Sequence, residues 1–222
     1  MKHWNNLTIE DYQHIYGIIV DETLNDFDKE VKLVALVNEL TEEEVDNLPI
    51  DKFKSMKDTL AFLHDGKIDG KLKGIIKANG NKYQISLDAF KITYGQYVDL
   101  TSFMSADGGL IGNLHLIMAS LAMPVKRNWL GIPYVDGYGA KAHAEVANDM
   151  LKANFADCHN TCIFFCKLIN DLTKVTVRYS VKEILKNKKA TKAKLREILK
   201  PLKQDGGGST MLNLLKDLKE LN

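Results

Sequence analysis

The spacing of apolar residues divides the first 64 residues into helical segments. After Thr8, a favoured N-cap residue type, apolar side chains recur every three or four positions and predict a helix: Ile9, Tyr12, Ile15, Tyr16 and Ile19. A second amphipathic run contains Phe27, Val31, Val34, Leu36 and Val37. Thr41 and Glu44 have the spacing of a capping box. Pro49 precedes a third run, which carries Phe53, Met56, Leu60 and Leu63 on one face.

The periodicity changes in residues 65–92. Three glycines interrupt the helical pattern in HDGKIDGKLKG, and two β-prone runs then flank Asn79-Gly80. An Asn-Gly pair between such runs is a strong signal for a two-residue β-hairpin turn. Because an isolated two-stranded hairpin is barely stable in water, we expect it to pack on the helices or to pair with strands of neighbouring copies.

Helical patterns return in residues 93–173. They occur in YGQYVDLTSFM, in LIGNLHLIMASLAM up to Met123-Pro124, and in a long stretch from Ala140 with a bend expected near Asp157. Residues 124–139 contain two prolines, three glycines and several aromatic residues. This composition predicts an exposed loop that is either a binding surface or a packed lid.

Residues 174–222 are predicted to form a basic helical hairpin and a tethered terminal helix. From residue 174 to 203 there are 11 Lys/Arg and 2 Asp/Glu, and Thr191 is the expected N-cap of the second arm. Three glycines, residues 206–208, precede a short apolar stripe of Met211, Leu214, Leu215 and Leu218. The whole chain is therefore predicted to be mainly α with a small β-hairpin (α+β), as a helical bundle with a basic C-terminal helical hairpin.

Charge is distributed unevenly along the 222 residues, although the net charge is only +1. Residues 1–70 hold 7 Lys/Arg against 16 Asp/Glu, whereas residues 171–222 hold 13 against 6. We expect one basic surface to meet an acidic partner, such as residues 1–70 of a neighbouring copy, or DNA phosphates without sequence preference. Its residues are Lys186, Lys188, Lys189, Lys192 and Lys194. The sequence offers no signal peptide or membrane span, so we expect a cytosolic protein without a membrane partner.

All three cysteines lie within nine positions. If this stretch is one helix, Cys158, Cys162 and Cys166 form a stripe at i, i+4, i+8, flanked by apolar residues. Thiolates on one continuous helix cannot surround a tetrahedral zinc ion, so we interpret the stripe as core packing. Two alternatives stay open: a partial metal site completed by His115 or His143, and a redox enzyme built on the cluster.

Known catalytic signatures are absent from the sequence. The stretch Gly206–Ser209 lacks the preceding strand and the following Lys of a phosphate-binding loop. Nucleophile elbow, zinc-protease and kinase signatures are also missing. We therefore predict a protein that is not an enzyme and needs no cofactor.

Four segments carry a resemblance to a known family. They are HWNNLTIEDYQHI, then LTEEEVDNLPIDKF with KDTLAFL, then KITYGQYVDLTSFM, and last NLHLIMASLAMPV with a G-x-x-Y-x-x-x-Y-like loop. In pattern and order they resemble tailed-bacteriophage morphogenesis proteins from phages of Bacteroidota, including crAss-like phages. The resemblance covers residues 3–170 and has no catalytic signature. It implies a tail assembly protein or a virion component near the head-to-tail junction, and it transfers no functional residue.

Together these observations predict a structural protein of a phage particle, assembled in the host cytoplasm. We expect a ring-forming component of the head-to-tail connector or tail, whose partners are copies of itself and portal, connector or tail proteins. A tail assembly chaperone that is absent from the finished virion is the alternative. The expected contacts between copies come from the hairpin at Asn79 and Gly80 and from the terminal stripe of Met211, Leu214, Leu215 and Leu218.

Overall fold

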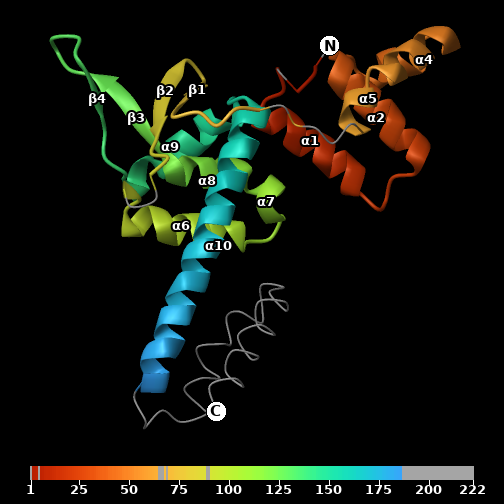
Figure 1. Cartoon of the computed structure of the whole chain (residues 1–222). Coiled ribbons are helices and arrows are strands. Elements are labelled where there is room, and N and C mark those ends of the chain that lie inside the picture. The colour runs from red at the N-terminus through yellow and green to blue at the C-terminus, as the bar shows by residue number, and fades with distance from the viewer. Residues whose placement is uncertain (1, 5, 65–67, 69, 89–90, 187–222) are drawn as a thin grey trace. The chain divides into compact units, whose positions relative to one another are not determined.

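The computed structural model describes residues 2–4, 6–64, 68, 70–88 and 91–186 (Figure 1). The fold is mainly α with a small antiparallel β-sheet, which confirms the predicted class. The chain divides into two compact units, Met1–Phe165 and Cys166–Asn222. Among the described helices, none is long and apolar enough to cross a membrane.

The N-terminal helices begin where the sequence predicts. Thr8 and Asp11 form a reciprocal capping box at the start of the first helix, and Thr41 and Glu44 form another at the third. The third apolar run, in contrast, is divided in two near Thr59. The helices are α1 (Ile9–Val20), α2 (Asp26–Asn38), α3 (Glu42–Asp46), α4 (Ile50–Asp58) and α5 (Ala61–His64).

An aromatic cluster joins the N-terminal helices to the rest of the first unit. Phe155 stacks on Tyr12 with ring centroids 3.8 Å apart and on Trp4 at 5.8 Å. The Trp4 indole meets Phe62 edge-on and donates a hydrogen bond to its carbonyl oxygen. These contacts bury residues that are distant in the sequence, so this part of the core forms only when the middle of the chain is in place.

The predicted hairpin at Asn79-Gly80 is confirmed, but it is not isolated. The strands β1 (Ile75–Ala78) and β2 (Asn81–Ile85) pair antiparallel around a turn in which both central residues have positive φ, 48° and 78°. Strand β3 (Ala122–Arg127) then pairs with β2, and β4 (Pro133–Val135) pairs with β3. The prediction of a loop over residues 124–139 was therefore wrong, because this segment extends the sheet to four strands in the order β1-β2-β3-β4.

Helices α6 (Tyr94–Met104), α8 (Leu114–Leu121) and α9 (Ala140–Leu151) pack together beside the sheet. Their inward side chains are fully or almost fully buried: Leu100, Leu114, Ile117, Met118, Val146 and Met150. The run predicted as one helix up to Met123 is instead α7 (Gly109–Gly112), then α8, then strand β3. Asn113 separates α7 from α8, and its side chain donates to the backbone oxygens of Asp107 and Gly109.

The long helix predicted from Ala140 is interrupted. It ends at Leu151, and α10 (Phe155–Lys186) begins after a break whose last residue, Asn154, caps the new helix by accepting a hydrogen bond from the Asp157 amide. The break lies slightly before Asp157, where a bend was expected. The second arm of the basic hairpin, the glycines 206–208 and the terminal apolar stripe lie outside the described residues.

Candidate interaction surfaces

Strands β3 and β4 form a hairpin that we call the β3–β4 arm, residues 122–135. In its outer part Val125 lies opposite Val135, and Arg127 lies opposite Pro133. Figure 1 shows this arm extending beyond β1 and β2, away from helices α8 and α9. The register places residues 128–132 at its tip.

The tip of the arm has a defined conformation. The Asn128 side-chain oxygen accepts hydrogen bonds from the amides of Leu130 and Ile132, at 3.0 and 2.9 Å. The Asn128 amide donates to the carbonyl oxygen of Ile132, and the Arg127 guanidinium donates to that of Gly131. Gly131 has a φ of 75°, which favours glycine. The side chains at the tip are thus presented by an ordered turn.

Large apolar side chains cover this tip and are open to solvent. Trp129 is 91% exposed, Leu130 is 59% exposed and Ile132 is 55% exposed. Tyr134 and Val135 on β4 are exposed as well. Exposed apolar side chains gathered on one turn make this tip a candidate interaction surface, and Trp is among the residue types that contribute most to binding energy.

Polar contacts fix the base of the arm. Lys126 and Asp136 form an ion pair, and the Asp136 amide donates to the Pro124 carbonyl oxygen at 2.9 Å. The hydrogen bond and charge of Lys126 lower the pKa of Asp136, and Asp136 raises the pKa of Lys126 in the same way. Both side chains are charged at neutral pH, and the pair orients the arm where it leaves the sheet.

Ser120 and His143 lie as close together as the serine and histidine of a hydrolase, but the Ser120 hydroxyl also contacts a backbone carbonyl oxygen. Ser120 Oγ lies 3.1 Å from His143 Nε2, and it also donates its only hydrogen to the Leu116 carbonyl oxygen at 3.0 Å. With the hydroxyl hydrogen directed at Leu116, His143 donates to Ser120, which requires the tautomer that carries the proton on Nε2. Ser120 is completely buried, and the His143 ring stacks on Phe103. The pair packs α8 against α9.

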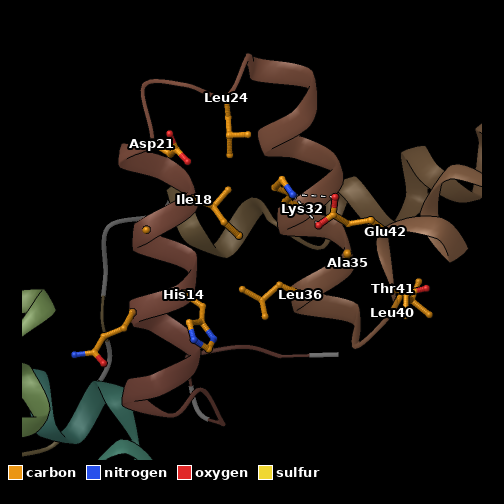
Figure 2. A pocket seen from close by; sticks show the side chains of 12 residues that line it. His14, Ile18, Asp21, Leu24, Lys32, Ala35, Leu36, Leu40, Thr41 and Glu42 are labelled. Carbon is orange, nitrogen blue, oxygen red and sulfur yellow. Dashed lines mark hydrogen bonds and ion pairs between the residues drawn. The ribbon is translucent and has the colours of Figure 1, made fainter.

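A second surface feature is an open groove between the first two helices, which we call the α1–α2 groove. Its volume is about 740 Å³. Figure 2 shows Ile18, Leu24 and Leu36 pointing into the space between the helices, while Lys32 and Glu42 pair along one side. The remaining lining residues are Gln13, His14, Gly17, Asp21, Ala35, Leu40 and Thr41. The groove thus combines an apolar floor with a polar rim.

The structure places the Asn79 side chain against its own chain. Asn79 and Asn81 donate to the carboxylate of Asp149 at 2.8 and 2.7 Å, and the Tyr83 hydroxyl donates to it as well. Burial alone would raise the pKa of Asp149, but these three hydrogen bonds together lower it. Of the two expected arrangements, packing on the helices or pairing with neighbouring copies, the structure has the first: α9 contacts the hairpin, and β3 of the same chain extends it. A role of Asn79 and Gly80 in oligomer contacts stays a prediction.

Two of the three cysteines lie in the core. Cys158 and Cys162 are completely buried, and Cys166 is half-buried. Burial raises the pKa of the Cys158 thiol, which keeps it protonated at neutral pH. His115, one of the two histidines considered as a further metal ligand, has its Nδ1 atom 3.0 Å from the side-chain nitrogen of Gln13. The Nδ1 atom of His159 is buried without a hydrogen-bond partner. Within the described ranges, no three His, Cys, Asp or Glu side chains are arranged to hold a metal ion.

The remaining predicted contact residues are not placed by the structure. Lys186 is the last residue of α10, and nothing is described of its side chain. Lys188, Lys189, Lys192, Lys194, Met211, Leu214, Leu215 and Leu218 lie outside the described residues.

Sequence reasoning did not identify the two surfaces that the structure brings out. The arm was foreseen only as an aromatic segment with a potential binding role, and the signal for a hairpin was weak because its turn has five residues. The groove has no signal in the sequence, because it depends on how α1 packs against α2.

Comparison of the chain with protein-family models, with curated proteins and with solved structures finds no match.

Proposed function

We propose that this protein is a non-enzymatic assembly protein of a tailed-phage particle, and that it acts as a ring-forming component of the head-to-tail connector or tail. The observation that carries the proposal is the β3–β4 arm with Trp129 exposed at its tip. The phage setting comes from the sequence resemblance over residues 3–170.

The arm supports an assembly role for two physical reasons. An ordered turn that presents Trp129, Leu130 and Ile132 loses little conformational entropy on binding, so it is suited to enter a partner surface. A side chain as exposed as Trp129 buries little apolar area in its own chain, so it contributes little to the stability of that chain. A protein that works through such a contact needs neither a cofactor nor a catalytic group.

Incorporation into particles is the direct test. Particles are assembled with a Trp129→Ser/Leu130→Ser variant, with Tyr94→Ser as the control, because Tyr94 is a large exposed aromatic on α6, outside the arm. Mass spectrometry of the purified particles measures the amount of the protein, and a plaque assay measures infectivity. We expect the arm variant to be lost from the particles or to yield tailless heads, with the control unchanged.

The outcomes separate the alternatives. Full incorporation of the arm variant with normal infectivity would contradict the proposal. If the wild-type protein is absent from mature particles and the arm variant still blocks tail formation, the protein acts as a tail assembly chaperone. If neither the protein nor its arm affects the particle, the phage assignment is wrong.

A further inference from the structure

We propose that the tip of the β3–β4 arm of one copy occupies the α1–α2 groove of the next copy. This inference rests on the proposed function and adds to it the identity of the partner surface. It commits to a second copy of this chain as the occupant, with Trp129 as the residue that enters the groove.

The two surfaces match in chemistry. The groove has a floor of aliphatic side chains, including Ile18, Leu24 and Leu36. The groove is open to solvent, and its volume of about 740 Å³ leaves room for one large side chain between the helices. An indole ring buries roughly 150–250 Å² of surface when it is enclosed. The tip therefore supplies an apolar group of suitable size, and the groove supplies the apolar walls.

The charges of the two segments are complementary. Residues 8–46, which carry α1, α2 and α3, hold 12 Asp/Glu and 2 Lys/Arg. The arm, residues 122–135, holds Lys126 and Arg127; Lys126 is paired with Asp136, which leaves Arg127 as the basic side chain without an acidic partner in the arm. At the groove itself, Glu42 is paired with Lys32, and Asp21 adds a further acidic side chain. Opposite charges on the two sides favour encounter between copies and fix their orientation.

The arrangement of the surfaces allows copies to be joined in series. The arm and the groove share no residue, and Figure 1 shows the tip of the arm lying away from α1 and α2. One chain can therefore offer its arm to one neighbour and accept an arm from another. A contact between two different surfaces closes into a ring when the rotation between copies permits it.

Photo-crosslinking identifies what the arm touches. The full chain carries benzoylphenylalanine in place of Trp129, is mixed with an isotopically heavy copy, and is irradiated at concentrations up to about 1 mM, where even millimolar affinity is detected. We expect crosslinks from position 129 of one copy to peptides of α1 or α2 of the other. Crosslinks within one copy, crosslinks to other regions, or no crosslink would each overturn the inference.

A substitution inside the groove tests its role without disturbing the core. Gly17 lines the groove, is exposed, and a Cβ added there meets no atom within 4 Å. Gly17→Trp fills the groove, whereas Gly17→Ala adds only a methyl group. Both replace a glycine within α1, so neither is expected to lower the unfolding midpoint. We expect the crosslink yield to fall at least about tenfold for Gly17→Trp and to stay near wild type for Gly17→Ala.

The results distinguish this inference from the function it rests on. If Gly17→Trp folds normally and crosslinks like Gly17→Ala, the groove is not the site of the arm. If position 129 instead crosslinks to another phage protein in assembling particles, the assembly role stands and the contact between copies is wrong. If the arm variant also leaves particle assembly intact, both proposals fail.

Discussion

Thr8 and Asn154 face each other in an antiparallel β-bridge, and each is the cap of a helix. Two backbone hydrogen bonds flank the bridge, from Ile9 to the Ala153 oxygen at 3.0 Å and from Phe155 to the Leu7 oxygen at 2.8 Å. The start of α1 is thereby tied to the start of α10. Loss of either cap should affect both helices.

Replacing Asn154 by alanine tests this coupling. The variant loses the side-chain acceptor for the Asp157 amide, and we expect the free energy of unfolding to fall by about 1 kcal/mol, within the range of roughly 0.5–2 kcal/mol for N-cap losses. Asn154→Asp keeps an acceptor and serves as the control. Urea unfolding followed by circular dichroism measures both. Equal stability of Asn154→Ala and Asn154→Asp would show that the cap does not contribute.

The carboxylate of Asp149 gives a prediction about pH. Its pKa in the folded protein lies below 3.8, the ordinary value for an aspartic acid, so its charged form stabilises the fold at higher pH. This stabilisation is lost as the pH falls through the folded pKa. We expect wild type to be more stable than Asp149→Asn at pH 7, with the difference shrinking below pH 3.8. Urea titrations from neutral to acidic pH test this, and a difference that grows on acidification would refute it.

The cysteines should differ in reactivity. Cys158 and Cys162 are completely buried and Cys166 is half-buried, so a thiol reagent should label Cys166 first in the native protein. Peptide mass spectrometry after short exposure to iodoacetamide identifies the labelled residue. In urea all three should react alike. Rapid native labelling of Cys162 would argue against the packing role.

The two tryptophans report on the arm. Trp4 is 5% exposed and Trp129 is 91% exposed, so acrylamide should quench the fluorescence of Trp129 strongly and that of Trp4 weakly. The Trp129→Phe variant should retain only protected emission at shorter wavelength. As protein concentration rises, the proposed contact should protect Trp129 in the wild-type chain. Unchanged quenching across conditions in which copies associate would place Trp129 outside the contact.

Local features of this fold could be predicted from the sequence, while features set by distant partners could not. The caps at Thr8 and Thr41 and the turn at Asn79-Gly80 depend on neighbouring residues alone. By contrast, Met123 continues an apolar run of helical period, yet it lies in β3 because it pairs with Gln84 of β2. The sequence contains no local signal for that pairing.

The same distinction applies to the cysteines and to the α1–α2 groove. Cys158 and Cys162 were predicted to be buried because their apolar neighbours recur with helical period, and they are buried. The groove was not predicted, because Ile18 and Leu36 look like ordinary core positions on two amphipathic helices. Only the packing of those helices leaves space between them.

The aromatic cluster around Phe155 also determines when the N-terminal region can finish folding during synthesis. The ribosome makes Trp4 and Tyr12 first, and Phe155 follows roughly 10–30 seconds later at typical elongation rates. Until then the two N-terminal rings lack the ring that covers them. During that interval the nascent chain carries aromatic surface without its final cover, and a translational pause before residue 155 would lengthen it.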